Sequence, residues 1–139
     1  MPKDENVKNC FLAFLDWYES NNVEVLETEK SLITDKYCYA GTCDMIAIVN
    51  GKKYLIDLKT SKAIYSDYKL QLAAYRIIYG EDINVAILRL DKEYGDYEFK
   101  DFTKNIENSE KAFLSLLDYY YYAAKRRLKN NPKVKEIWK

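Results

Sequence analysis

The sequence predicts a single α/β (α+β) domain over residues 1–139, with helices on both faces of a central sheet. Helical and strand-like periodicities follow one another in the order α-β-β-β-α-β-β-α. Two consecutive strand segments, residues 37–49 and 52–60, are apolar on both faces, which is typical of central strands covered on each side. Apolar residues make up 48% of the chain and charged residues 32%, so a globular protein with a real core is expected.

The first predicted helix covers residues 4–20, because apolar side chains recur there at helical spacing. The Asn21-Asn22 pair ends this helix, and residues 23–33 then show the partial alternation of a strand. The side chains expected to form the buried stripe of the helix are Val7, Phe11, Phe14, Leu15 and Tyr18.

The next two strands are joined by Asn50-Gly51, the type of turn that gives the strongest short-range hairpin signal, because both residues tolerate positive φ. With this turn, paired positions have numbers that sum to 101, which places Asp44 directly opposite Asp57. Directly opposed residues have Cβ atoms roughly 4.5–5.5 Å apart. Two carboxylates at that separation repel each other unless a cation lies between them.

A second helix is predicted from Ser66, a suitable N-cap, to Tyr79, with Gly80 as its end. A second hairpin follows, with strands at residues 83–91 and 94–103 around either Gly95 or a Lys92-Glu93 turn. The side chains expected to be buried on this helix are Leu70, Ala74, Ile77 and Ile78.

A long C-terminal helix is predicted to begin at Asn105 or Asn108 and to end at Asn130-Asn131-Pro132. The tyrosine run 119–122 in this helix could stack on single-stranded bases, but two of its members fall on the core stripe, which favours packing. The expected core positions are Phe113, Leu117, Tyr120, Tyr121, Ala124 and Leu128.

Composition excludes several classes of chemistry. The chain has no histidine, so His-ligated zinc, Ser-His-Asp triads and Cys-His pairs are unavailable to it. Its 22 basic and 22 acidic residues balance, which argues mildly against a high-affinity nonspecific DNA binder. The three cysteines lack CxxC spacing and are expected to be reduced packing residues. Without a membrane-length apolar run or a signal peptide, a cytoplasmic location and no membrane partner are expected.

Asp44, Asp57 and Lys59 form the candidate site. Strand alternation places Lys59 on the same face as Asp57, and Asp44 faces both across the hairpin. Mg²⁺ typically takes one or two carboxylates together with waters and phosphate oxygens, and the Leu58 carbonyl is a possible third protein ligand. This pattern indicates a Mg²⁺ or Mn²⁺ site for phosphoryl chemistry, whereas an isolated Asp-x-Lys pair would be an ordinary surface ion pair.

The chain resembles the PD-(D/E)XK nuclease superfamily, in its RecB-like and phage-exonuclease-like branch. The matching segments are YAGTCD at residues 39–44, YLIDLKTS at 54–61 and QLAAY at 71–75. The resemblance covers most of residues 5–90 and implies a restriction-endonuclease-like αβββαβ core with a mixed sheet. The final strand and the long C-terminal helix would be additions to that core. The first aspartate follows Gly-x-x rather than proline, a variant common in that branch.

By this resemblance, Asp44 and Asp57 bind metal, Lys59 is catalytic, and Gln71 with Tyr75 forms the motif on the following helix. Gln71 and Tyr75 are four residues apart and therefore share one helical face. The resemblance also implies bacterial or phage origin. Members of the branch that carry an iron–sulfur cluster have four cysteines, so no cluster is implied here.

Further candidate residues surround this set. Glu29 is the candidate for the family's upstream acid and could bind a second metal, although Glu27 has the same strand parity and stays an alternative. Lys62, Lys69 and Arg76 are candidates for substrate binding along a phosphate track, against the reading that each is a plain surface cation.

The resulting expectation is a metal-dependent nuclease that hydrolyses phosphodiester bonds in DNA. The resemblance points to an exonuclease in recombination, repair or phage replication, acting on single-stranded DNA or duplex ends. Two alternatives stay open: a nucleic-acid-binding subunit of the same fold whose activity is weak or lost, and a dimeric structure-selective endonuclease. The short chain leaves little room for a strand-gripping domain, so a partner protein or a homo-oligomer is conceivable.

Overall fold

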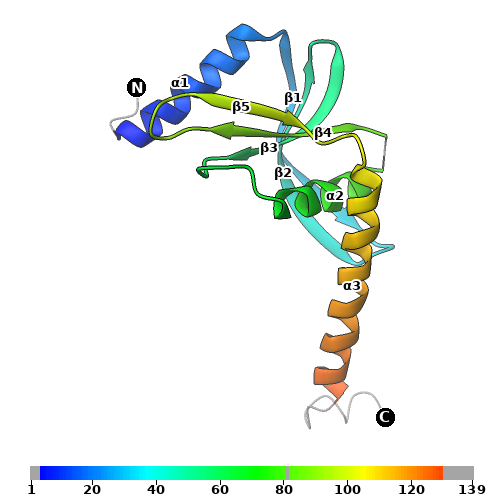
Figure 1. Cartoon of the computed structure of the whole chain (residues 1–139). Helices are drawn as coiled ribbons and strands as arrows, with labels where there is room; N and C mark the ends of the chain where they lie inside the picture. Colours follow the sequence, from blue (N-terminus) through cyan, green and yellow to red (C-terminus); the bar gives the residue numbers. More distant parts are fainter. Residues whose placement is uncertain (1–3, 81, 130–139) are drawn as a thin grey trace.

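The computed structural model describes residues 4–80 and 82–129, which form a five-stranded mixed sheet flanked by helices (Figure 1). The elements are α1 (Glu5–Ser20), β1 (Val23–Thr34), β2 (Tyr39–Val49), β3 (Lys52–Lys59), α2 (Asp67–Tyr79), β4 (Asn84–Leu90), β5 (Tyr97–Asp101) and α3 (Ile106–Lys129). The α/β class and the order of elements predicted from the sequence are therefore confirmed.

The strands lie in the order β1-β2-β3-β4-β5. All neighbouring pairs are antiparallel except β3 and β4, which are parallel. A parallel pair needs a crossover connection, and here α2 provides it. The C-terminal ends of β3 and β4 therefore lie on the same side of the sheet, and Asp57 and Lys59 are near the C-terminal end of β3.

Each face of the sheet has its own apolar core, as the sequence predicted for the central strands. On one face α1 inserts Trp17, which is fully buried, against side chains such as Met45 and Ile56. On the other face α2 inserts Leu72, also fully buried, against side chains such as Ile46 and Leu55. The site residues lie on the α2 face, in the same row of β3 as Leu55.

The predicted buried stripe of α1 is largely wrong. Val7 is 53% exposed, and Phe11 and Tyr18 are each 43% exposed. The helix instead packs through fully buried Ala13 and Trp17, and the Trp17 ring stacks on Phe99 with centroids 5.8 Å apart. A small residue beside a large ring allows close approach to the sheet, which apolar periodicity alone does not reveal.

In α2 the capping glycine was predicted correctly: Gly80 has φ 77° and its N–H donates to the Arg76 carbonyl. Ser66 precedes the helix but makes no side-chain capping bond. The buried positions are Leu72, Ala73, Ala74 and Arg76, whereas Leu70, Ile77 and Ile78 are half-buried. Because both the sheet and α3 cover this helix, its buried surface is wider than one stripe.

The second hairpin has a longer loop than predicted. Residues 91–96 connect β4 to β5, closed by a hydrogen bond from the Asp91 N–H to the Asp96 carbonyl. Gly95 lies in this loop with φ 75°.

None of the helices in residues 4–80 and 82–129 is both long and apolar enough to cross a membrane.

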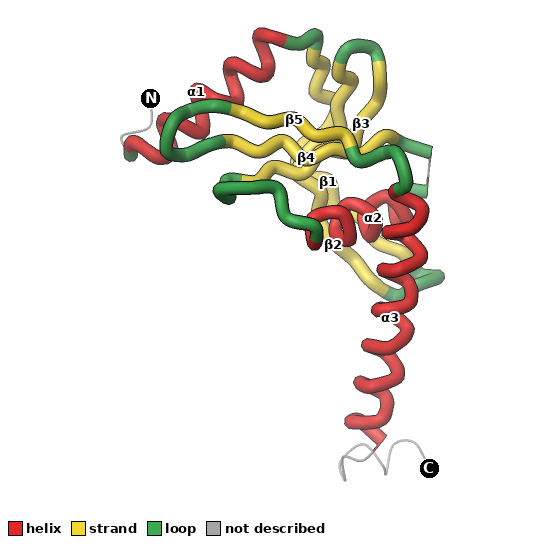
Figure 2. The backbone as a smooth tube through the Cα atoms, in the orientation of Figure 1, coloured by secondary structure: helices red, strands yellow, loops and turns green. Residues whose placement is uncertain are grey.

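The first half of α3 packs on α2 and on the start of β2, and the helix then continues past the sheet (Figure 2). Phe113 lies edge-on to Tyr39, with ring centroids 5.1 Å apart. The predicted core stripe is weaker than expected: within residues 106–127 only Ile106 is buried, and Tyr120 is 60% exposed. Nothing is described for the side chain of Leu128.

Candidate active site

The β2–β3 hairpin has the predicted register. Five cross-strand pairs sum to 101, from Val49 with Lys52 to Met45 with Ile56. Both turn residues have positive φ, 51° at Asn50 and 84° at Gly51. Regular pairing stops at Met45, one position before Asp44, so Asp44 is not a ladder partner of Asp57.

The alternation of side chains between the two faces of the sheet is interrupted in β2 near the point where pairing with β3 ends. Cys43 and Ile46 are three residues apart, yet both belong to the core on the α2 side, so strict alternation is broken between them. Asp44 lies within this irregular step, and its Oδ2 accepts a hydrogen bond of 2.7 Å from the Leu58 N–H. The Asp44 carboxyl is also near enough to Asp57 to help raise the pKa of that residue. The two acids therefore lie near each other as predicted, but not as a pair of directly opposed residues in the hairpin.

Asp57 is held in an environment that disfavours its charge. Its side chain is 4% exposed. Burial, followed by the hydrogen bond to the Asp44 carboxyl, raises the pKa of Asp57 to about 6, and Lys59 partly opposes this shift. Lys59 Nζ lies 2.8 Å from Asp57 Oδ2, an ion pair, but no hydrogen bond of regular geometry reaches this oxygen from the described residues. One buried carboxylate oxygen thus keeps a free lone pair.

Lys59 links the acids to helix α2. Its Nζ donates a hydrogen bond of 2.7 Å to Gln71 Oε1 and lies 4.6 Å from the centroid of the Tyr68 ring. Gln71 Nε2 in turn donates to the Tyr75 hydroxyl at 3.0 Å. The structure therefore brings together all five residues predicted to be catalytic, in one connected polar group between β2, β3 and α2.

Gly41 allows the tyrosine of this group to approach β2. A Cβ atom at position 41 would lie 2.8 Å from Tyr75 Cε1, closer than carbon atoms pack. Two residues earlier, the Tyr39 hydroxyl donates a hydrogen bond of 2.7 Å to the Ala74 carbonyl and fixes the strand against the helix. The Gly-x-x-Asp segment thus has a packing reason for its glycine.

Sequence reasoning missed Tyr68, whose ring lies beside the Lys59 ammonium. The Tyr68 hydroxyl also donates to Ser61 Oγ at 2.9 Å, which ties α2 to the segment after β3. Its spacing of three residues before Gln71 could have identified it, because residues at i and i+3 share a helix face.

Glu29 is not brought together with the two aspartates. Its side chain is exposed and its φ is 49°. The alternative, Glu27, forms an exposed ion pair of 3.0 Å with Lys30. Among residues 4–80 and 82–129 there is no group of three or more His, Cys, Asp or Glu that could hold a metal ion. The bulge in β1 after Val25 changes the register, which strand parity could not foresee.

The substrate-binding prediction for Arg76 needs correction. Arg76 is buried, donates to the Ile83 carbonyl at 2.9 Å, and pairs with Asp82 and with Glu110 of α3. Its charge is therefore used inside the protein and cannot also bind a phosphate. The sequence did not reveal that α3 covers α2, so Arg76 was expected to be exposed.

The two lysines differ from each other. Lys69 is exposed, but its Nζ lies 5.2 Å from the centroid of the Phe102 ring, on a part of α2 turned away from Gln71. Lys62 is exposed in the segment after β3 and borders a hollow of about 180 Å³ between that segment and residues 91–94. Of the three predicted cations, Lys62 is the one next to the end of β3.

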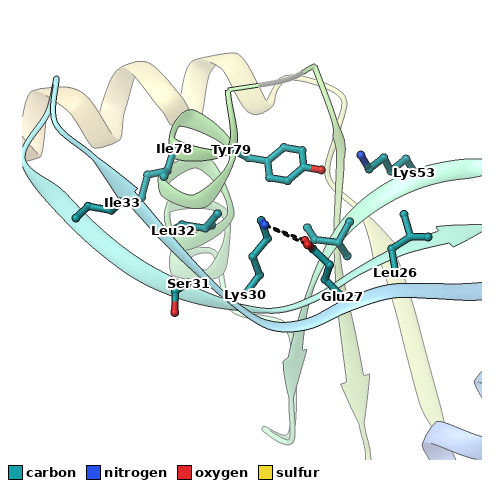
Figure 3. Close-up of a pocket in the computed structure, with 10 residues that line it drawn as sticks. Leu26, Glu27, Lys30, Ser31, Leu32, Ile33, Lys53, Ile78 and Tyr79 are labelled. Atoms are coloured by element: carbon teal, nitrogen blue, oxygen red, sulfur yellow. Dashed lines mark hydrogen bonds and ion pairs between the residues drawn. The ribbon is translucent and has the colours of Figure 1, made fainter.

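A separate hollow of about 640 Å³ lies between β1 and the C-terminal end of α2 (Figure 3). Tyr79 and Lys53 extend over it, and the Glu27–Lys30 ion pair lies on its other side. Neither aspartate of the pair lines it. The hollow is thus separate from the polar group, which sits against the other end of α2.

The residues present fit a divalent metal ion. Mg²⁺ and Mn²⁺ prefer oxygen ligands, and two protein carboxylates suffice when waters and phosphate oxygens complete the shell. Asp57 Oδ2 is buried and contacts Lys59 Nζ at 2.8 Å, and the nearby Asp44 carboxylate supplies a second set of oxygens. A cation here would offset the repulsion between the two carboxylates.

Neither a protein-family model nor a curated protein matches this chain.

Proposed function

We propose that this protein is a Mg²⁺- or Mn²⁺-dependent nuclease that hydrolyses phosphodiester bonds in DNA, on a restriction-endonuclease-like αβββαβ core. The observation that carries the proposal is the pair of neighbouring carboxylates, Asp44 and Asp57, of which Asp57 is buried and held by an ion pair with Lys59. Buried like charges are costly, and a bound cation removes that cost. The first six elements, α1 to β4, follow the αβββαβ order that the resemblance implies, and this order supports the proposal.

Asp44 and Asp57 would hold the ion, with the Leu58 carbonyl as a further oxygen at the same strand end. Such an ion neutralises charge on the scissile phosphate and lowers the pKa of a bound water. The Leu58 N–H keeps the Asp44 carboxylate oriented through its 2.7 Å hydrogen bond. The protein groups are therefore positioned before the substrate arrives.

Lys59 would stabilise the negative charge that develops on the phosphate. It is only partly exposed, and Asp57, Gln71 and the Tyr68 ring fix its ammonium in place. A preorganised charge of this kind needs no rearrangement during the reaction. Gln71 and Tyr75 act as positioning residues, since they hold Lys59 from the α2 side.

The test is digestion of end-labelled linear DNA and of circular DNA, with Mn²⁺ or with EDTA, for wild type and Asp57→Asn. Wild type should degrade DNA only with metal, and the variant should not. Cleavage of the linear substrate alone would assign exonuclease action. Equal cleavage by the variant would place the chemistry elsewhere and overturn the proposal.

A second candidate is a nucleic-acid-binding subunit whose activity is weak. The observation in its favour is that no third acid joins Asp44 and Asp57 among the described residues. In the same assay this candidate predicts DNA binding without release of nucleotides. It also predicts that Mn²⁺ leaves the melting temperature unchanged.

A further inference from the structure

The part of α3 that extends past the sheet carries aromatic rings that the protein core does not use. Tyr119 is 70% exposed, Tyr120 is 60% exposed and Tyr122 is 58% exposed. Only Tyr121 is turned inward, where its hydroxyl donates to the carbonyls of Tyr37 and Cys38. The packing role expected for this run therefore holds for one residue in four. Figures 1 and 2 both show this part of α3 standing clear of the sheet.

Cations follow the rings along the same helix. Lys125, Arg126 and Arg127 are all exposed. From Lys111 to Lys129 the sequence has five basic residues and one acid, Asp118, although the whole chain is neutral. The part of α3 after Glu110 is therefore a positive region on a protein of zero net charge.

Rings and cations lie on common faces of the helix. Tyr119, Tyr122 and Arg126 are spaced i, i+3, i+7, so they form one row. Within this row the Arg126 guanidinium lies 5.9 Å from the Tyr122 ring centroid and its Nη1 donates to the Tyr122 hydroxyl at 3.4 Å. Tyr120 and Arg127, seven residues apart, form a neighbouring row. Each row thus offers a flat apolar surface followed by a positive charge.

On the basis of the nuclease function proposed above, we infer that this face, formed by Tyr119, Tyr120, Tyr122, Lys125, Arg126 and Arg127, binds single-stranded nucleic acid. Proteins that hold single strands combine aromatic rings for base stacking with cations along the backbone. Duplex DNA keeps its bases stacked on each other, so exposed rings favour a single strand. A second copy of this chain fits less well, because three adjacent cations would face a surface of the same sign.

The position of the face suits a strand that also reaches the candidate site. Tyr121 anchors α3 to Cys38, and Asp44 is six residues further along the same stretch of chain. At the rise of an extended strand this separation is about 20 Å. Sites for single strands commonly cover about 4–16 nucleotides, so one strand can contact both places.

The inference can be tested without the cleavage reaction. Binding of a fluorescein-labelled 20-nucleotide oligo(dT) is measured by anisotropy in EDTA, for wild type, Tyr119→Ala/Tyr122→Ala and Arg126→Gln. Loss of two stacking rings should weaken binding by at least about 5-fold and up to about 150-fold per base lost. Loss of Arg126 should reduce the slope of log K against log salt by about 0.7.

Matched controls are available on the same chain. Tyr18 is 43% exposed on α1, on the other face of the sheet, so Tyr18→Ala removes an accessible ring far from α3, and Lys104→Gln removes an exposed charge before α3. Both should bind as wild type does. Far-UV circular dichroism should be unchanged in all variants, because the substituted side chains are exposed.

Two results would overturn the inference: wild-type affinity in Tyr119→Ala/Tyr122→Ala, or a wild-type dimer that this double variant converts to a monomer in sedimentation. Failure of the proposed function looks different. Oligo(dT) binding that depends on this face, together with no cleavage in Mn²⁺, supports the inference and removes the nuclease.

Discussion

Asp57 is the residue whose chemistry most depends on its surroundings. Asp57→Asn keeps the shape of the side chain and removes one of two neighbouring acids, so we expect DNA cleavage in Mn²⁺ to fall at least about 100-fold, since even indirect partners of a metal ligand cost 10–100-fold. Fluorescence-detected digestion of labelled DNA measures this loss. Asp35→Asn, at a residue without a place in the site, should cleave DNA normally.

The same carboxyl predicts how stability depends on pH. Its folded pKa of about 6 is raised above the ordinary 3.8, so the folded state holds a proton that the unfolded state has lost. In metal-free buffer its contribution to stability is therefore greatest below pH 4 and is lost as pH rises to about 6. The loss is on the order of 3 kcal/mol. Urea unfolding in EDTA at pH 4 and pH 7 measures it.

Asp57→Asn is again the comparison, because it cannot titrate. The variant should lose less stability between pH 4 and pH 7 than the wild type and should be at least as stable at pH 7. An identical pH dependence in both proteins would show that Asp57 has an ordinary pKa.

Counting from the Asn50-Gly51 turn predicted the register of β2 and β3 correctly as far as Met45 and Ile56, because a two-residue turn fixes the pairing of the residues next to it. The same count failed for Asp44, because regular pairing ends at Met45 and the alternation of β2 is broken between Cys43 and Ile46. Glu29 illustrates the same limit: a bulge shifts register, and parity counting then fails.

At the scale of elements, the contact between β2 and α2 depends on Gly41. Gly41→Ala would place a carbon 2.8 Å from Tyr75 Cε1, so the ring or the strand must move. We expect a loss of about 1–3 kcal/mol in unfolding free energy, typical of overpacking. Cleavage should also fall, because Tyr75 supports Gln71 and thereby Lys59. Thr42→Ala, at an exposed neighbour, should change neither quantity.

Helices α2 and α3 are joined through Arg76. Arg76→Met keeps much of the apolar stem but leaves Glu110 and the Ile83 carbonyl without their donor. Breaking a buried charged contact of this kind should cost about 3 kcal/mol, visible as a lower melting temperature in calorimetry. Lys69→Met, on an exposed part of the same helix, should cost much less. A similar loss in both variants would mean that Arg76 is only a surface cation.

Helix prediction from periodicity gave the positions of α1, α2 and α3 but not their buried faces. In α1, periodicity selected Val7 and Phe11, whereas packing selected Ala13 and Trp17. A helix face is chosen by what the sheet offers opposite it, and that information is spread over distant strands. In α3 the tyrosines were predicted to be partly buried because they are apolar. The helix extends beyond the sheet, however, so three of the four stay exposed.

For the molecule as a whole, metal binding should raise the free energy of unfolding. A ligand that binds only the folded state adds about 2.7 kcal/mol at 100 times its dissociation constant, or several degrees in melting temperature for a domain of this size. Mn²⁺ should therefore raise the melting temperature of the wild type and leave that of Asp44→Asn nearly unchanged. Equal shifts in both would show that the ion binds at another place.

The attachment of α3 has a consequence for its motions. Glu110 near its start is paired with buried Arg76, and Tyr121 holds it to the β1–β2 connection, but the residues that follow have no comparable anchor to the sheet within the described part of the helix. Amide hydrogens in the first turns should then exchange with solvent only when the whole domain opens, whereas those after Tyr122 should exchange through local fraying. One helix would thus show two rates of deuterium uptake, with the step near the tyrosine run.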